Sequence, residues 1–565
     1  MQESSARRKR LALLTLCVTM FMSMLDNVIV NNALPRIGQD LDAGISGLQW
    51  VAEGYSLVYA GLVLTGGALG DRHGRTRMFR LGLALFTVGS ALAALAGTIG
   101  LLVGARMLQG VGAALLTPGS LTLLRHVFTD ERERAKAVGL WSGVSALGLS
   151  IGPVVGGPMV EHLGWASVFW INVPIGVAGL VLAARVLPDI PPRARRIDLG
   201  GLVLSAAGLG LLVYALIEGP SRGWTDARVL LCGAAALVLL AAFLVLELRL
   251  AEPMLELRLF RDGALGGALL SGFMVSFGIF GALFFLPLLM QGPLGWSPSD
   301  AGYAGLPMTG MIVLAAPLSG RLTSRYGPRL PLVLGLVLCA AGLGGLSLYG
   351  EHAHYVEYLW TLFAMGLGMG MTFTPVSIAV LQRVAPAQTG MASATINTLR
   401  ELGGVLGIAV LGAVLTNRMT GTLTAALHRI GVPPDAVGPI ADAPAGAGRG
   451  GGGAAAVLPG PVQEVVDGAF IEGLHLAARC GAVALAVTAV LVAVLLGRAR
   501  PAAPSGTGLP EPTPEPAQES TPGRNPGPNP DPNPGPGPNP DPNPGPGPNP
   551  DPNPGPEPLA EVRSL

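Results

Sequence analysis

Charged side chains are scarce in this sequence, and lysine is almost missing. Of the 565 residues, 13% are charged and 50% are hydrophobic. Lys9 and Lys136 are the only lysines. Soluble domains carry about 25% charged residues, so the composition excludes a set of soluble domains and indicates an integral membrane protein. The formal net charge of +1 gives no sign of a nucleic-acid partner.

Patterns typical of catalytic, metal and nucleotide sites are also missing from the sequence. The four cysteines lie far apart inside apolar runs, at Cys17, Cys232, Cys339 and Cys480, which favours packing roles over a disulfide framework or a metal site. The seven histidines form no ligand pattern, and neither lysine stands in a nucleotide-binding P-loop. We therefore expect no enzyme, no cofactor, no bound metal and no obligate protein partner, and we do not expect ATP-driven transport.

What the sequence does contain is a series of fourteen apolar runs, each near the length of about 20 residues that crosses a bilayer as a helix. The runs are 11–30, 48–69, 78–96, 101–124, 137–160, 168–187, 199–217, 229–248, 266–290, 301–320, 330–349, 358–381, 397–416 and 474–496. The first run follows four basic residues, but it is too long for a signal peptide and no cleavage site follows it. We expect it to be a retained span.

The basic residues predict the orientation of these spans. Most arginines fall in the connections on the same side as the N-terminus, and the positive-inside rule places that side in the cytoplasm. An even number of spans puts the C-terminus there too. The preference for arginine over lysine suggests a GC-rich bacterial genome. We expect a multi-pass protein of the cell membrane.

A charged stretch at 66–80 joins the second and third runs. A connection of about eight residues between two spans is a tight hairpin at one membrane face. Its glycines and charges follow the order Gly67, Gly70, Asp71, Arg72, Gly74 and Arg75. This spacing resembles the loop motif between spans two and three of the major facilitator superfamily. The resemblance implies that Asp71, Arg72 and Arg75 form a gate between the two halves; the alternative is a simple topology anchor.

Ionisable residues inside a span cost about 2.5 to 3.5 kcal/mol on insertion scales, so each one suggests a function. Asp26, with Asn27 and Asn31 close behind it, stands toward the outer part of the first run. The stretch 25–35 resembles the first-span motif of the fourteen-span drug:proton antiporters and departs from it at one position. The resemblance implies that Asp26 takes part in proton coupling, in a central cavity.

Two further residues are candidates for proton coupling. Arg106 opens a stretch, with Gln109 three residues on, that resembles the fourth-span motif of the superfamily. Because arginine stays protonated, we expect Arg106 to hold the charge of a nearby carboxylate, and the sequence does not say which one. The alternative is an anchor at the membrane interface. Glu53, between Trp50 and Tyr55, is either an interfacial residue or a proton site that faces the cavity.

The stretch 397–404 looks like the thirteenth-span signature of the same family, and glutamine is more usual at the position of Glu401. Glu401 either adds a titratable site or pairs with Arg400, and we favour the pair. The polar residues expected to line the cavity are Asn27, Asn31, Gln109, Asn397 and Glu401.

The fifth run carries glycines every four residues, at Gly148, Gly152 and Gly156, together with Pro153 and Gly157. Small residues at this spacing share one helical face and let a neighbouring backbone approach closely. The pattern also resembles the antiporter motif of exporters in this superfamily. It therefore favours export over uptake.

We predict an all-α integral membrane protein with the major facilitator fold, made of two pseudo-symmetric six-helix halves and two inserted central helices. The expected parts are a basic N-terminus (1–10), the N-terminal half (11–187), the inserted helices (198–250), the C-terminal half (266–497) with an external loop (417–470), and a disordered proline-rich tail (501–565). The expected activity is drug:proton antiport by alternating access, with the lipid bilayer, protons and a small-molecule drug as partners. The alternatives are an exporter or symporter of one metabolite and, less favoured, a membrane sensor.

Overall fold

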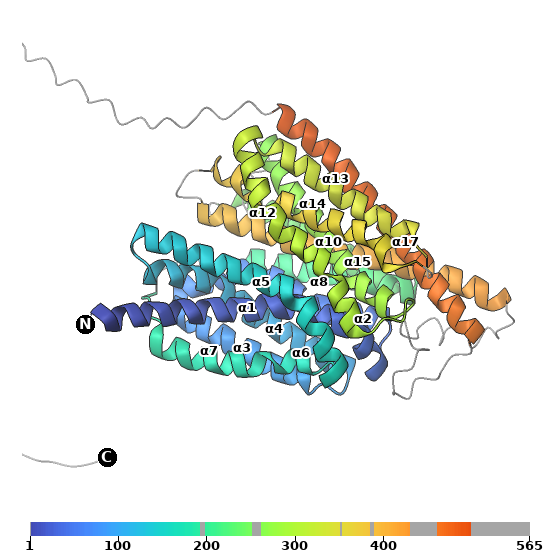
Figure 1. The fold of residues 1–565 in the computed structure, drawn as a ribbon, viewed down its shortest axis with the longest axis horizontal. Helices are drawn as coiled ribbons and strands as arrows, with labels where there is room; N and C mark the ends of the chain where they lie inside the picture. The colour runs from blue at the N-terminus through green and yellow to red at the C-terminus, as the bar shows by residue number, and fades with distance from the viewer. Residues whose placement is uncertain are drawn as a thin grey trace, which may run out of the picture. The chain divides into compact units, whose positions relative to one another are not determined.

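The computed structural model describes residues 2–192, 198–250, 262–350, 353–384, 389–429 and 460–498, all within one compact unit, Met1–Ala502. Over these ranges every regular element is helical and none is a strand (Figure 1). The elements are α1 (Gln2–Asp40), α2 (Ile45–His73), α3 (Arg75–Ala94), α4 (Ile99–Val127), α5 (Glu131–Leu163), α6 (Ser167–Trp170), α7 (Asn172–Val186), α8 (Leu199–Arg222), α9 (Ala227–Arg249), α10 (Gly263–Gln291), α11 (Pro298–Ala304), α12 (Leu306–Tyr326), α13 (Arg329–Gly345), η2 (Leu346–Leu348), α14 (Tyr355–Leu381), α15 (Thr389–Arg429) and α17 (Gly460–Arg498).

Thirteen helical segments in the described part of the chain are long and apolar enough to cross a membrane. The sequence-predicted second span, α2, is not among them, because Gln49, Glu53 and several glycines lower its mean hydropathy. It is nevertheless 29 residues long and packs between α4, α8 and α15. With α2 included, the fourteen predicted spans are all helices, and the prediction of an all-helical membrane protein is confirmed.

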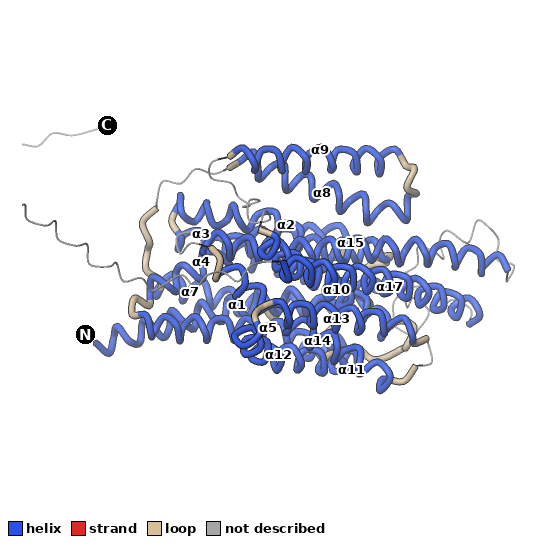
Figure 2. The backbone as a smooth tube through the Cα atoms, turned by 90° about the horizontal axis from the view of Figure 1, so that it is seen from above, coloured by secondary structure: helices blue, strands red, loops and turns tan. Residues whose placement is uncertain are grey.

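The helices form two groups joined by a hairpin. Helices α1 to α7 pack on one another, as do α10 to α17, while α8 and α9 form a pair beside them (Figure 2). Glycines bring neighbouring helices into contact in each group. A Cβ on Gly112 of α4 would lie 2.6 Å from the carbonyl oxygen of Gly82 in α3. Small residues are what allow helices to associate closely in lipid, where no hydrophobic effect drives them together.

The charged connection at 66–80 is shorter than expected. Helix α2 continues to His73 and α3 begins at Arg75, so Gly74 alone lies between them. Its φ of +99° belongs to a region that only glycine enters without strain. The turn is closed further by an ion pair between Arg75 and Asp71 across it. The predicted loop of about eight residues is therefore a one-residue turn between two helices.

The predicted loop at 417–470 is wrong at both ends, because α15 continues to Arg429 and α17 begins at Gly460. The extension of α15 buries Met419, Leu423 and Leu427, which recur every four residues. Arg418 forms an ion pair of 3.0 Å with Glu472 of α17. This apolar period was present in the sequence and was missed. Residues 430–459 and the proline-rich tail lie outside the described residues.

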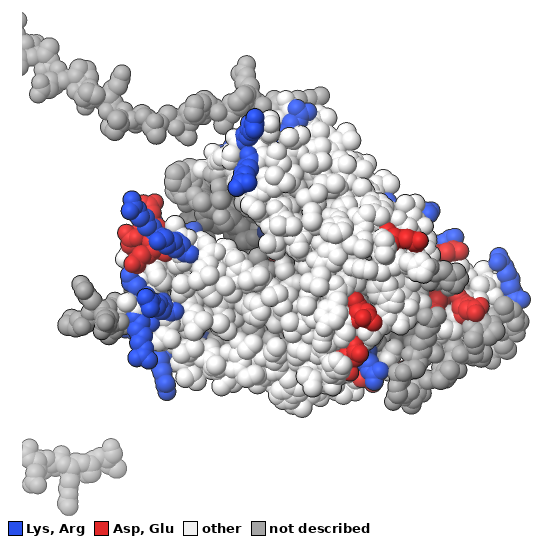
Figure 3. Space-filling model, viewed as in Figure 1, with Lys and Arg blue, Asp and Glu red and all other residues white. Residues whose placement is uncertain are grey.

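The two ends of the bundle differ in charge and in closure. Lys and Arg gather on the side where α1 begins, which we name the basic end (Figure 3); there Lys9 of α1 pairs with Glu133 of α5 at 2.8 Å. At the other end, which we name the closed end, the two groups of helices are bonded together. The Gln291 amide donates to the carbonyl oxygen of Asn32 at 3.0 Å, and the backbone N–H of Ser299 donates to Glu161 at 3.1 Å.

Candidate functional site

A buried ion pair lies at the centre of the N-terminal group of helices. Asp26 of α1 and Arg106 of α4 are hydrogen-bonded through Arg106 Nη1 and Asp26 Oδ2, with side chains 0% and 1% exposed. Asp26 Oδ1 accepts two further hydrogen bonds, from Gln109 at 3.0 Å and from Asn172 at 2.7 Å. The carboxylate that Arg106 holds, which the sequence left open, is thus Asp26. Removing one partner of such a pair leaves the other charge buried and uncompensated.

The arginine of this pair is fixed on all sides. Its Nε donates to the carbonyl oxygen of Val51 at 3.3 Å and its Nη1 to Gln109 at 3.1 Å. Its guanidinium lies 4.7 Å from the ring centroid of Tyr55 and 5.9 Å from that of Phe169. Cation–π contacts of this kind strengthen when the cation is desolvated. The network therefore fixes one protonatable carboxylate in a defined set of donors.

Three members of the network were not predicted from the sequence as site residues: Asn172, Ser90 and Tyr55. Gln109 donates to the Ser90 hydroxyl at 2.8 Å, and the Tyr55 and Ser23 hydroxyls are 3.2 Å apart. Asn172 is fully buried at the start of α7. The sequence contained one signal for Asn172, a single amide side chain inside an apolar run. The partners it finds depend on the packing of α1 against α4 and α7.

Asp26 is enclosed by helices of its own half. All of its hydrogen-bond donors come from α4 and α7, and its side chain has no exposed surface. The expectation that it stands open to a central cavity is therefore wrong for this conformation. Of its neighbours on α1, Asn27 is half-buried and Asn31 is 7% exposed. Asn31 lines a small cavity of about 30 Å³ between the two halves, near the closed end.

Glu53 is completely buried in α2, at 0% exposure, which rules out the interfacial alternative. Within the described residues neither of its carboxyl oxygens has a hydrogen-bond partner. One turn earlier on α2, Gln49 donates to the carbonyl oxygen of Ile408 in α15 at 3.1 Å. This places Glu53 close to the contact between the two halves. A buried carboxylate without partners is costly while it is charged.

Arg400 and Glu401 make no direct ion pair among the described residues, but their charges lie close enough to interact electrostatically. The Arg400 guanidinium lies 3.5 Å from the ring centroid of Phe373. Glu401 is half-buried and lies near enough to Tyr59 of α2 to interact with it electrostatically. Asn397 is exposed. Adjacent residues of a helix point about 100° apart, which explains why the two charges do not meet.

The glycines of α5 pack in two directions. A Cβ on Gly148 would lie 2.7 Å from the carbonyl oxygen of Phe21, and one on Gly156 would lie 2.7 Å from Ile29 Cγ1, both in α1. Gly152 packs on Val28 of the same helix. The expected packing seam is therefore the contact of α5 with α1.

The other part of this motif contacts the opposite half. A Cβ on Gly157 would overlap the carbonyl oxygen of Pro298, and one on Gly302 of α11 would overlap the carbonyl oxygen of Pro153. The Pro153 carbonyl also accepts a hydrogen bond of 2.8 Å from the Asn32 amide. Backbone contact between α5 and α11 thus seals the closed end.

The glycines and charges of the α2–α3 turn lie at the basic end. The ion pair of Asp71 with Arg75 borders a cavity of about 230 Å³ that Gly70, Thr122 and Arg125 also line. Gly67 packs on Pro118 of α4, while Arg72 is exposed. All of these neighbours belong to the N-terminal half. The predicted latch to the other half stays a prediction.

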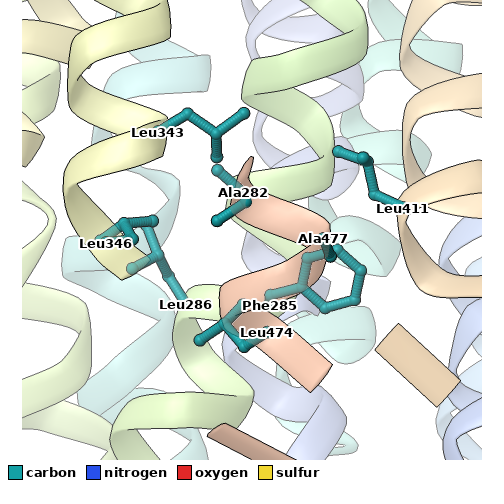
Figure 4. Close-up of a pocket in the computed structure, with 9 residues that line it drawn as sticks. Ala282, Phe285, Leu286, Leu343, Leu346, Leu411, Leu474 and Ala477 are labelled. Carbon is teal, nitrogen blue, oxygen red and sulfur yellow. The ribbon is translucent and has the colours of Figure 1, made fainter. Parts of the chain in front are cut away.

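A small apolar void in the C-terminal group lies between α10, α13, α15 and α17 (Figure 4). Ala282, Phe285, Leu343 and Leu411 point into it. Its volume of about 10 Å³ is at the lower limit for one water molecule. We assign it to imperfect packing and not to ligand binding.

Comparisons with known proteins agree with this architecture. The model of the Major Facilitator Superfamily matches residues 16–408. The chain is 38% identical to the tetracenomycin C resistance and export protein of Streptomyces glaucescens, over 85% of this chain and 90% of that protein. It is 38% identical to the multidrug resistance protein Stp of Mycobacterium tuberculosis (74% and 79%), and 35% identical to the methylenomycin A resistance protein of Bacillus subtilis (73% and 89%).

Solved structures share the fold at low sequence identity. A bacterial homologue of the human lysosomal transporter Spinster, in an inward-facing and occupied conformation, superposes with a TM-score of 0.59 at 16% identity, over 86% of this chain and 96% of that one. The peptide transporter POT in complex with sulfate gives a TM-score of 0.56 at 15% identity, over 86% and 95%. The helical architecture, the family model and the relatives lead to one conclusion: the chain belongs to the major facilitator superfamily.

Proposed function

We propose that this chain is a proton-coupled exporter of amphipathic or cationic drugs in a bacterial cell membrane, with the basic end and both termini in the cytoplasm. The observation that supports it most is the buried pair of Asp26 and Arg106, which places a protonatable carboxylate inside a membrane helix. Such residues in transporters mark proton relays. Relatives named for drug resistance and export support the drug as cargo. The arginine-rich connections support the orientation.

The site suggests how proton and cargo are coupled. A proton that reaches Asp26 cancels the charge that holds Arg106, so the helices α1 and α4 lose their strongest link. A second arrangement of the two helices then has a free energy similar to that of the first, and the equilibrium between inward- and outward-open states shifts. Each charge that moves inward across 100 mV supplies about 2.3 kcal/mol. This free energy is sufficient to drive export of the drug against its concentration gradient.

The test is efflux of ethidium from energised cells that make this protein, against cells with the empty vector. We expect faster efflux with the protein, and we expect a protonophore to abolish the difference because it dissipates the proton gradient. Efflux that survives the protonophore would contradict proton coupling. The absence of any difference would contradict broad drug export.

The second candidate is an exporter of a single compound. Two of the relatives are named for one antibiotic each, tetracenomycin C and methylenomycin A. Under this alternative, cells with the protein would resist one antibiotic class in a growth assay and would retain ethidium. The same panel of strains separates the two candidates.

Glu53 provides a further test of the coupling. Its carboxyl oxygens have no partner among the described residues, so Glu53→Gln removes a titratable group without breaking a hydrogen bond. We expect the melting temperature in detergent to stay the same or rise by a few degrees, which corresponds to about 1 kcal/mol or less. If Glu53 carries a proton during transport, fewer protons will enter per drug molecule, as measured by pH-sensitive dye in proteoliposomes. An unchanged ratio would remove Glu53 from the proton path.

A further inference from the structure

An apolar groove of about 320 Å³ lies between α1 and α7, which pack side by side (Figure 1). Leu14 and Val18 of α1 line one wall, and Ala178 and Leu182 of α7 line the other. The one hydroxyl among the lining residues, that of Thr15, donates to a backbone carbonyl oxygen of its own helix at 2.8 Å. The groove therefore suits a hydrocarbon chain and not a polar ligand.

Small residues of α7 create this groove and leave it open to lipid. A Cβ on Gly179 would lie 3.1 Å from Thr19 Cγ2, so α7 approaches α1 closely, while the short side chain of the exposed Ala178 leaves space above the contact. Val177 (51% exposed) and Val181 (45%) stand beside it on the same helix. Exposed apolar side chains on a membrane-spanning helix face lipid, so an acyl chain has direct access to the groove.

One end of the groove is basic. Arg8 Nε donates to the carbonyl oxygen of Val186 at 3.1 Å, which holds the start of α1 against the end of α7. Arg10 lies one turn before Leu14 on the same face of α1, and Arg185 lies one turn after Leu182 on α7. Both side chains are exposed. They stand at the basic end of the molecule, where Lys and Arg gather (Figure 3).

The acidic residues near these two arginines are bonded to other cations. Glu133 pairs with Lys9 at 2.8 Å, and Asp189 lies 3.8 Å from Arg80. In the part of the chain that the structure describes, neither Arg10 nor Arg185 takes part in an ion pair. Two guanidinium groups at the end of an apolar groove are therefore available to an anion from outside the protein.

From this arrangement we propose that the groove between α1 and α7 binds an anionic phospholipid of the leaflet at the basic end, with an acyl chain along the groove and the phosphate beside Arg10 and Arg185. Basic pockets between membrane helices recognise anionic lipid headgroups in this way. A zwitterionic lipid fits less well, because its ammonium group is repelled by the same arginines. The proposal needs the helices to span a membrane, and it is independent of the proposed cargo.

A lipid in this groove would stabilise the candidate proton site. It contacts α1 and α7 together, and these two helices carry Asp26 and Asn172, which are hydrogen-bonded at 2.7 Å. A ligand that binds the folded chain and not the unfolded one raises the melting temperature. We therefore expect phosphatidylglycerol to raise the melting temperature of the purified protein in detergent more than phosphatidylcholine does.

Native mass spectrometry of the purified full chain, with either lipid added, measures binding directly. In the double variant Arg10→Gln with Arg185→Gln, we expect the dissociation constant of the first phosphatidylglycerol to rise at least about tenfold, because arginines near the membrane surface attract anionic lipid. The matched control is Arg321→Gln with Arg325→Gln, two exposed arginines of α12 in the other half. An equal loss in both double variants would mean that net charge alone attracts the lipid, and would overturn the site.

A second pair of variants tests the groove itself and leaves every charge in place. Ala178→Phe fills the groove from an exposed position, so the variant should fold, and we expect it to lose the rise in melting temperature that phosphatidylglycerol produces. Val177→Phe, on the neighbouring residue outside the groove, should keep that rise. The same rise in both variants would show that no acyl chain lies between α1 and α7, and would overturn the proposal.

Discussion

Asp26→Asn is expected to abolish proton-coupled export. The substitution removes the protonatable group and keeps the size of the side chain. It also leaves Arg106 buried without its counter-charge, and breaking a buried pair in this way costs about 3–5 kcal/mol. Ethidium efflux should fall to the level of the empty vector, and the melting temperature of the purified protein should drop markedly.

The control separates coupling from folding. In the double variant Asp26→Asn with Arg106→Gln, both charges are gone, so most of the lost stability should return. Export should remain absent, because the carboxyl group is still missing. A double variant that regains export would show that Asp26 is needed for structure and not for coupling. Export by Asp26→Asn alone at the normal rate would exclude Asp26 as the proton site.

Gly157→Val is the second substitution with a large expected effect. The new Cβ would overlap the carbonyl oxygen of Pro298 in the opposite half, so the closed end could no longer close. An exporter that cannot close to the outside should be held outward-open, and export should be lost. Its matched control is Gly139→Val in the same helix, where a Cβ meets no atom within 4 Å.

The rate at which a cysteine at the closed end is labelled from outside measures whether that end has opened. A cysteine introduced as Ser299→Cys should react slowly with a membrane-impermeant maleimide in the otherwise unaltered chain, because the Ser299 hydroxyl that the thiol replaces is buried. The reaction should become several times faster when Gly157→Val is added, and stay slow when Gly139→Val is added. Equal labelling and export in all three would mean that α5 and α11 do not meet during the transport cycle.

The features of the fold that can be predicted from the sequence are those that depend on local composition, namely the membrane spans and the sites of close helix contact. Runs of about 20 apolar residues predict spans because each residue adds 1.5 Å and the bilayer core has a fixed thickness. The glycine spacing from Gly148 to Gly156 predicts a close helix contact, because small residues on one helical face let another backbone approach. Neither rule says which helix is the neighbour. The partner of Gly156 is α1, whereas Gly157 one residue later contacts α11 of the other half.

In the candidate site, too, the sequence shows which residues need a partner but not which partner they have. That Asp26 and Arg106 need compensation follows from the cost of charge in a membrane, but their pairing depends on the packing of α1 against α4. The amide of Asn172 and the hydroxyl of Ser90 were overlooked, because single polar residues in apolar runs have many possible partners. Glu53 had two readings from its place beside Trp50, and only its burial in the folded chain decides between them.

The one-residue turn at Gly74 has a mechanical consequence. With no flexible linker between α2 and α3, and with Asp71 and Arg75 paired across the turn, the two helices are hinged only at one glycine. Helix α2 carries Glu53 and α3 carries Ser90, which bonds to the Gln109 of the Asp26 network. A tilt of α2 at the contact between the halves would therefore turn α3 about Gly74 and disturb the hydrogen bonds that reach Asp26 through Gln109.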